Sequence, residues 1–462
     1  MLSPARLARR RAGLACLVAA PILLTAATAV DPALGDVDFA EAIAADPSAA
    51  RLHTLLLHWC WVLFVPGLLA LLAPIRRRGR VLATIAWPAA ALGLATFAGL
   101  TLSDYFGLAV LDVADVAAFE RVEEQVAQYG WLAAGWQVPG LLGWAAALLL
   151  TPLAAARAGQ VGWWYPATAV PGFALYLLFA IEEPPLSLAG PVLLTAANAV
   201  LAARLWSRPQ AEAGEEGFAA FRRTVGVVCL IGAPLALAAG MATLPGGAFH
   251  IAGGFAADPG AAQASAFFLH LAWLLFIPAV VEVTGRLTGR GWRLGQAAGA
   301  LALIGLLHFN GLMIGDYAGL ATEQVLDPVR AEAVTARLGE YASLSLGVAL
   351  PGMAGALLGL ILVPVAAARA GLVRWPVPVL AGVGVAAFLA LTVGRVPGLV
   401  APLLLLAAYG LLARALATGA RTPAAGSGAE PALDSGRSGG AEPAPTLDSG
   451  RSGGAEAVQQ AG

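Results

Sequence analysis

The sequence predicts an all-α membrane protein of about twelve transmembrane helices, built as two parallel six-helix repeats. Of its 462 residues, 59% are hydrophobic and only 12% are charged, whereas roughly 25% of residues are charged in an average soluble protein. Apolar runs of roughly 20 residues, long enough to cross a bilayer as helices, alternate with short charged segments. Motifs of the first half recur 212 residues later, as His58 and His270 illustrate (270 − 58).

The apolar runs define the expected transmembrane helices. In chain order we expect spans near residues 12–30, 54–74, 81–103, 131–153, 164–181, 187–206, 224–243, 266–284, 295–315, 342–366, 376–393 and 398–416. The runs lack the alternation of apolar and polar residues that is typical of membrane β-barrels. Spans of this kind are therefore expected to be α-helices whose main solvent is lipid.

The distribution of arginine predicts the orientation of these spans. All 27 basic residues are arginine, a bias that is typical of proteins encoded by high-GC bacterial genomes. If the N-terminus is cytoplasmic, the outer segments between spans contain only Arg51, Arg121, Arg330, Arg337 and Arg395. By the positive-inside rule, the protein is then a multi-pass protein of the bacterial cytoplasmic (plasma) membrane with both termini in the cytoplasm.

The recurrence of motifs predicts the domain organisation. His58-x-x-Trp61-x-Leu63-Phe64-x-Pro66 recurs as His270-x-x-Trp273-x-Leu275-Phe276-x-Pro278. We expect repeat 1 over residues 1–206, a cytoplasmic linker over 207–221, repeat 2 over 222–418, and a disordered cytoplasmic tail of Gly, Ser, Ala, Pro and Glu over 419–462. Six spans per repeat give both repeats the same orientation, so their axis of symmetry would lie along the membrane normal.

The first span has the flanking arginines and small-residue end of a secretory signal peptide. However, Arg222-Arg223, Cys229 and Pro234 repeat its layout of Arg10-Arg11, Cys16 and Pro21. A segment that is discarded has little reason to resemble a span in the middle of the chain. We therefore expect the first span to remain in the mature protein.

Histidines within the spans form the main candidate site, because ionisable residues in a membrane are costly and often functional. His270 and His308 each lie 19 residues from a turn near Gly289 (289 − 270 and 308 − 289), which predicts equal depth on adjacent helices. His58 and Thr96 stand in the same relation to the turn near Arg77. His270, His308 and His58 are therefore candidates to bind haem or a metal ion, or to pass protons. The alternative is that each histidine donates to a neighbouring group and holds helices together.

Two carboxylate–tyrosine pairs lie further along the same helices. Asp104-Tyr105 and Asp316-Tyr317 are expected roughly 12 Å outward of the histidines, at about 1.5 Å per helical residue. Together with Thr96 they are candidates for contact with a substrate or proton. The alternative is a solvated carboxylate beside a tyrosine of the interfacial aromatic belt. After them, 116–126 and 329–338 read as amphipathic helices on the outer surface.

Two resemblances accompany these patterns. Two parallel six-span units with basic loops resemble the outline of the major facilitator superfamily of transporters. The loops Arg76-Arg77-Arg78-Gly79-Arg80 and Gly285-Arg286-Leu287-Thr288-Gly289-Arg290 lack the aspartate of that family's pattern. Each unit also resembles uncharacterised six-span membrane proteins of high-GC bacteria, which have a similar basic loop after the second span; that resemblance implies no activity.

These observations predict a transporter or solute-binding permease with a pathway between the repeats. The alternatives are a haem- or metal-binding redox protein and a membrane scaffold or assembly factor. An enzyme is not favoured, because no nucleophile stands in a recognisable catalytic motif. The expected partners are the lipid bilayer and a small solute or ion. No nucleic acid is expected, and the sequence leaves the oligomeric state and the identity of any cofactor open.

Overall fold

The computed structural model describes residues 4–35, 38–207, 218–247, 253–391 and 394–418, and these residues form helices and their connections without any β-strand. The expected tail, 419–462, and most of the expected linker, 207–221, lie outside the described residues. The first half contains α1 (Pro4–Ala29), α2 (Phe39–Ala45), α3 (Pro47–Leu72), α4 (Arg80–Pro88), α5 (Leu94–Leu100), α6 (Ser103–Val113), α7 (Val116–Ala127), α8 (Gly130–Leu132), α9 (Val138–Arg157), α10 (Trp164–Phe179) and α11 (Leu186–Trp206). The second half contains α12 (Phe218–Thr243), α13 (Gly254–Ala257), α14 (Pro259–Arg286), α15 (Trp292–Leu312), α16 (Ile314–Val325), α17 (Pro328–Glu340), α18 (Ala342–Leu344), α19 (Leu350–Arg369), α20 (Pro376–Ala390), α21 (Arg395–Gly398) and α22 (Val400–Thr418).

Ten helical segments within the described residues are long and apolar enough to cross a membrane. They are Arg6–Ala29, Pro47–Leu72, Arg80–Val113, Gly130–Arg157, Leu186–Trp206, Phe218–Thr243, Pro259–Arg286, Gly289–Val325, Ala342–Arg369 and Val396–Thr418. The prediction of an all-α, multi-pass membrane protein is therefore confirmed. The other two expected spans correspond to α10, of 16 residues, and α20, of 15 residues. At about 1.5 Å per residue, these helices are shorter than a bilayer core of about 30 Å.

Helix boundaries recur at the same 212-residue spacing as the sequence motifs. Both α3 and α14 begin at that interval, at Pro47 and Pro259. The pair α9 and α19 keeps the spacing at both ends. Each is preceded by one π-helical turn, Ala133–Gln137 in the first half and Ser345–Ala349 in the second. Such turns are rare and are frequent at functional sites.

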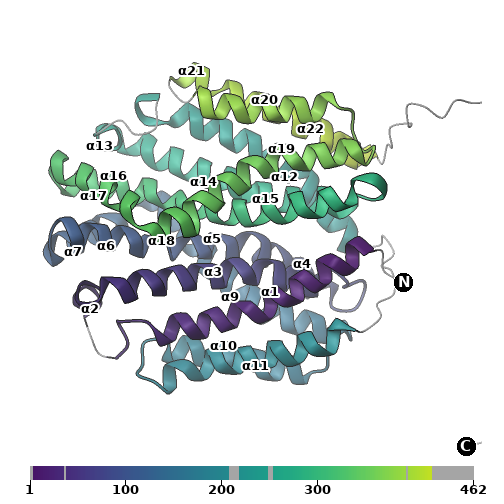
Figure 1. Cartoon of the computed structure of the whole chain (residues 1–462), viewed down its shortest axis with the longest axis horizontal. Coiled ribbons are helices and arrows are strands. Elements are labelled where there is room, and N and C mark those ends of the chain that lie inside the picture. Colours follow the sequence, from purple (N-terminus) through teal and green to yellow (C-terminus); the bar gives the residue numbers. More distant parts are fainter. Residues whose placement is uncertain (1–3, 36–37, 208–217, 248–252, 392–393, 419–462) are drawn as a thin grey trace, which may run out of the picture. The chain divides into compact units, whose positions relative to one another are not determined.

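The two halves lie on opposite sides of a central contact between α5 and α15. In Figure 1 the first-half helices, purple to blue, lie below the green and yellow helices of the second half. Gly99 on α5 touches Gly311 on α15, since a Cβ added at Gly99 would lie 2.9 Å from the Gly311 Cα. The absence of side chains at these two equivalent positions lets the helices approach closely.

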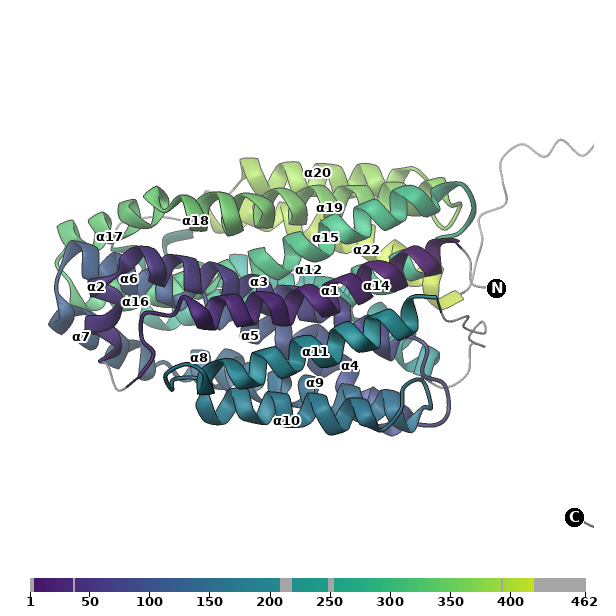
Figure 2. The same cartoon turned by 60° about the horizontal axis from the view of Figure 1, so that its bottom comes forward.

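A second hydrophobic core joins the halves at the end of the molecule opposite the N-terminus, which we call the cap end (Figures 1 and 2). There α7 of the first half packs on α16 of the second, and α17 packs on α6. Phe119 and Val122 of α7 and Val334 of α17 are buried within this core. Both segments expected to be amphipathic helices are thus helical, and their apolar faces pack on the opposite half of the protein.

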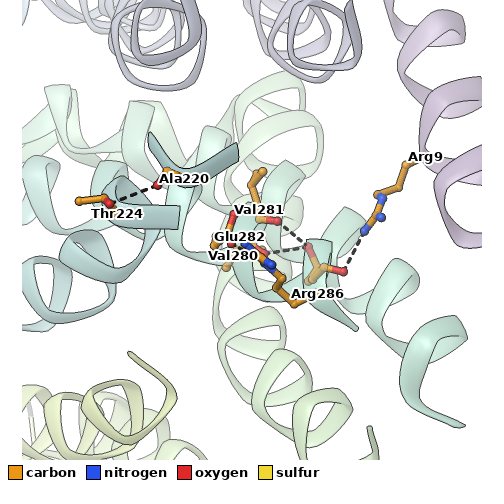
Figure 3. A network of polar contacts seen from close by, with 8 residues as sticks. Arg9, Ala220, Thr224, Val280, Val281, Glu282 and Arg286 are labelled. Atoms are coloured by element: carbon orange, nitrogen blue, oxygen red, sulfur yellow. Dashed lines mark hydrogen bonds and ion pairs between the residues drawn. The ribbon is translucent and has the colours of Figure 1, made fainter. Parts of the chain in front are cut away.

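The opposite end, which carries the N-terminus, holds a smaller polar contact between the halves. Figure 3 shows Arg9 of α1, whose Nη1 donates to the carbonyl oxygen of Thr284 near the end of α14 at 2.8 Å. Two residues earlier on α14, Glu282 forms an ion pair with Arg286 at 2.8 Å. The halves are therefore in contact at both ends of the molecule as well as at its centre.

Candidate functional site

His58 and His308 meet at the interface between the halves. Their rings, from α3 and α15, lie edge to face with 5.0 Å between centroids, and both side chains are 0% exposed. Trp59 packs on His308 at 4.3 Å, and its Nε1 donates to the carbonyl oxygen of Gly347 at 3.0 Å. One histidine of each half is thus held in van der Waals contact with a histidine of the other half.

His270 occupies a second pocket, across the interface from Thr96. The Thr96 Oγ1 lies 3.5 Å from the His270 Nε2. Trp136, on the π-helical turn of the first half, stacks on the His270 ring at 3.6 Å and donates from Nε1 to the carbonyl oxygen of Thr96 at 2.8 Å. His270 and Thr96 are buried. The π-helical turn therefore places the indole over this imidazole.

The two pockets have equivalent positions in the two halves. His270 corresponds to His58 and His308 corresponds to Thr96 at the 212-residue spacing (270 − 58 and 308 − 96). The structure brings all four residues to the interface, but in two pairs that each cross it. It does not pair His270 with His308, because equal depth on a hairpin does not decide which way each side chain faces. We call these four residues and Asn310 the His layer.

Hydrogen bonds determine which ring nitrogen carries the proton in the His58–His308 pair. The Nδ1 of His58 lies 2.8 Å from the carbonyl oxygen of Ala98, and the Nδ1 of His308 lies 2.9 Å from that of Ile304. Since a carbonyl only accepts, each Nδ1 of a neutral ring must be the protonated nitrogen. Each Nε2 is then a free acceptor, and both Nε2 atoms are buried without a hydrogen-bond partner.

Other atoms of the His layer are also unpaired. Asn310 donates from Nδ2 to the carbonyl oxygen of Ala95 at 3.2 Å, whereas its Oδ1 is buried without a donor. The Nδ1 of His270 lies beside Asn310 without a hydrogen bond of normal geometry. A buried polar atom without a partner costs about 1–3 kcal/mol. The Nε2 atoms of His58 and His308 are therefore two unsatisfied acceptors of the layer, which a cation or a hydrogen-bond donor would stabilise.

The residues present do not fit a haem held by two of the three candidate histidines. The rings of His58 and His308 touch, so no porphyrin can lie between them, and the Nε2 of His270 faces the hydroxyl of Thr96 at 3.5 Å. In the part of the chain that the structure describes, no three His, Cys, Asp or Glu side chains lie close enough to hold a metal ion. The His layer consequently offers one or two imidazole nitrogens to a ligand, and no complete protein-made metal site.

The carboxylate–tyrosine pairs lie apart from the His layer, toward the cap end. Tyr105 donates to the carbonyl oxygen of Arg51 at 3.1 Å, and Tyr317 donates to the equivalent carbonyl of Gln263 at 3.2 Å. Both rings are buried in the second hydrophobic core, where they hold α6 and α16 against the starts of α3 and α14. Asp104 accepts from Thr54 at 3.3 Å, and no hydrogen bond of the described residues involves the Asp316 side chain.

Two sets of side-chain hydrogen bonds that join the halves at the cap end were not predicted from the sequence. Tyr341 donates to Asp112 at 2.8 Å, and Arg337 pairs with the same carboxylate oxygen at 2.8 Å. At the equivalent place, Tyr129 donates to Gln324 at 2.7 Å. Burial raises the pKa of Tyr129 to about 12 and also raises the pKa of Tyr341, so both remain neutral donors at physiological pH. The recurrence of Tyr129 as Tyr341 was the available signal.

Comparison with known proteins found no matching family model, no similar curated sequence and no similar solved structure. The fold and the site define the class of protein: a multi-pass, all-α membrane protein with a buried imidazole pair between its halves. Any functional conclusion therefore depends on the geometry of the molecule itself.

Proposed function

We propose that the chain consists of two parallel six-helix repeats, related by a pseudo-two-fold axis that passes near the Gly99–Gly311 contact. Equivalent contacts made in both directions support this arrangement. The ring pair Tyr105–Tyr341 has centroids 6.2 Å apart, and its counterpart, Tyr317–Tyr129, has centroids 6.3 Å apart. The equivalent helices α7 and α17 lie at the same end of the molecule. Each half therefore crosses the membrane an even number of times.

The path of α10 supports a sixth crossing in each repeat. Its first residue, Trp164, lies under the guanidinium of Arg204, near the end of α11 that also contacts the N-terminal segment of α1. Just beyond its last residue, the carbonyl oxygen of Ile181 accepts from Gly35, which follows the other end of α1, at 2.7 Å. The residues at the two ends of α10 thus lie toward opposite ends of α1, although α10 has 16 residues and α1 has 26. By the spacing of the halves, α20 is its counterpart.

Within this architecture, the function that the site supports best is that of a transport-type or solute-binding permease. The His layer would take a small cation or a hydrogen-bond-donating solute. The observation that carries this proposal is the pair of unpaired acceptors in the layer, the Nε2 atoms of His58 and His308. In the described conformation the halves touch on both sides of the layer, so passage of a solute would require them to separate.

Thermal unfolding of the purified protein tests this proposal. Ammonium, methylammonium and Ag⁺ serve as cationic probes, and acetate and sulfate serve as anionic comparisons. A ligand that binds only the folded state raises the melting temperature with its concentration. We expect at least one cationic probe to raise the melting temperature of the wild type but not that of His308→Ala.

His53→Ala is the matched control, because His53 bonds to the carbonyl oxygen of Ala27 at 2.9 Å and lies outside the layer. This variant should respond to the probes as the wild type does. A response of His308→Ala equal to that of the wild type, or equal effects of cationic and anionic probes, would overturn the proposal. Such results would favour the scaffold alternative, in which the polar side chains only pack helices.

A further inference from the structure

A basic cavity lies in the first half, where the α3–α4 turn meets the end of α9. Gly79 has a left-handed backbone, with φ of 78°, and a Cβ there would lie 2.5 Å from the carbonyl oxygen of Ala154. Only glycine allows the turn to approach α9 so closely. The cavity of about 750 Å³ is lined by Arg77, Arg78, Gly79, Arg80, Val81, Leu82, Ala156, Arg157, Gly159 and Trp163.

The lining of this cavity divides into a charged part and an apolar part. Of the described residues that line it, four are arginines and none is a carboxylate, and Arg78, Arg80 and Arg157 carry the argument that follows. Beside them, Val81 is 72% exposed and Trp163 is 59% exposed. In a membrane protein, an exposed tryptophan beside arginines is typical of the depth of lipid headgroups. The cavity therefore presents guanidinium groups next to a surface that suits acyl chains.

We infer that this cavity binds the phosphate group of an anionic phospholipid. Guanidinium groups form paired, charge-assisted hydrogen bonds to phosphate oxygens, and basic pockets among membrane helices bind such headgroups. A free phosphate would use the same arginines but would leave Val81 and Trp163 uncovered. The apolar part of the lining thus favours a lipid as the source of the phosphate.

The second half provides an internal comparison. Gly291 docks there in the same way, since its Cβ would lie 2.5 Å from the carbonyl oxygen of Ala366. The residues equivalent to Arg77 and Arg80 are Gly289 and Trp292 (289 − 77 and 292 − 80). Arg290 and Arg369 correspond to Arg78 and Arg157. Removing Arg290 and Arg369 therefore changes the net charge by the same amount as removing Arg78 and Arg157, but at a place outside the cavity.

Native mass spectrometry of the full-length protein, titrated with short-chain phosphatidylglycerol in detergent, measures the binding. We expect Arg78→Ala/Arg157→Ala to weaken the tightest binding event by about tenfold or more, because both guanidinium groups that form charge-assisted hydrogen bonds to the phosphate are removed. Arg290→Ala/Arg369→Ala should retain that event. Arg78→Lys/Arg157→Lys keeps the charges and should lose less affinity, so it tests the site if the alanine variant does not fold.

Three results would overturn the inference. One is an equal loss of lipid in the second-half variant, which would indicate general attraction to basic residues. Another is equally tight binding of phosphatidylcholine, which has no net charge. The third is displacement of the lipid by millimolar inorganic phosphate, which would assign the site to a soluble anion.

Discussion

His58 and His308 stand 250 residues apart in the chain (308 − 58) and form an edge-to-face imidazole pair across the interface between the two halves. Each ring directs its Nδ1 to a main-chain carbonyl, which leaves both Nε2 atoms as buried acceptors without a donor. In metal- and proton-binding sites, a carbonyl that accepts a hydrogen bond from one ring nitrogen of a histidine fixes the tautomer. The second ring nitrogen is then unprotonated and can bind a metal ion or a proton. This arrangement leads to the first prediction.

His58→Ala and His308→Ala should be coupled, because each substitution removes one face of the same ring contact. Interacting residues commonly show coupling free energies of about 0.5–3 kcal/mol. We expect a value in this range from a double-mutant cycle of unfolding free energies in detergent. His270→Ala lies in the other pocket, and its combination with His58→Ala should be close to additive. Additive behaviour of His58→Ala with His308→Ala would refute the pairing.

Gly99→Ala should destabilise the contact between the halves. The added Cβ would lie 2.9 Å from the Gly311 Cα and 2.8 Å from a ring carbon of Trp136, so α5 and α15 must move apart. Overpacking of this kind costs about 1–3 kcal/mol. Gly382→Ala on α20 is the control, because nothing lies within 4 Å of its added Cβ. Melting temperatures should fall for Gly99→Ala and remain or rise for Gly382→Ala; an unchanged value for Gly99→Ala contradicts the close approach.

Tyr129 should contribute stability that is lost at alkaline pH. Burial raises its pKa from the usual value of 10.0 to about 12, so the folded protein favours the neutral phenol. For a group with a raised folded pKa, the stabilisation is complete below pH 10.0 and disappears as the pH rises toward about 12. Tyr129→Phe should therefore lose less stability than the wild type between these pH values. Parallel curves of melting temperature against pH for the two proteins would contradict this origin.

Cysteine labelling tests the orientation that the arginines predict. Glu120 on α7, Glu332 on α17 and Arg78 in the α3–α4 turn are all exposed. In a variant without Cys16, Cys60 and Cys229, an impermeant thiol reagent added to intact cells should label Glu120→Cys and Glu332→Cys and miss Arg78→Cys. The reverse pattern would show that the cap end faces the cytoplasm.

The sequence by itself determined the membrane class, ten of the twelve expected spans and the 212-residue recurrence. These features depend on local composition, because an apolar run of sufficient length becomes a helix in lipid whatever its neighbours are. The depth of the histidines also followed from residue counts along a hairpin. The expected spans 164–181 and 376–393 end two and three residues beyond α10 and α20 (181 − 179 and 393 − 390).

Only the tertiary structure decided which side chains meet. Equal depth leaves the rotation of each helix about its axis open, so residue counts could not pair His58 with His308 and His270 with Thr96. That choice depends on the close approach of Gly99 and Gly311, which sets how α3, α5, α14 and α15 face one another. The hydrogen bonds of Tyr341 with Asp112 and of Tyr129 with Gln324 likewise join segments from different halves. Such contacts between distant segments arise from packing, which the local pattern of residues does not encode.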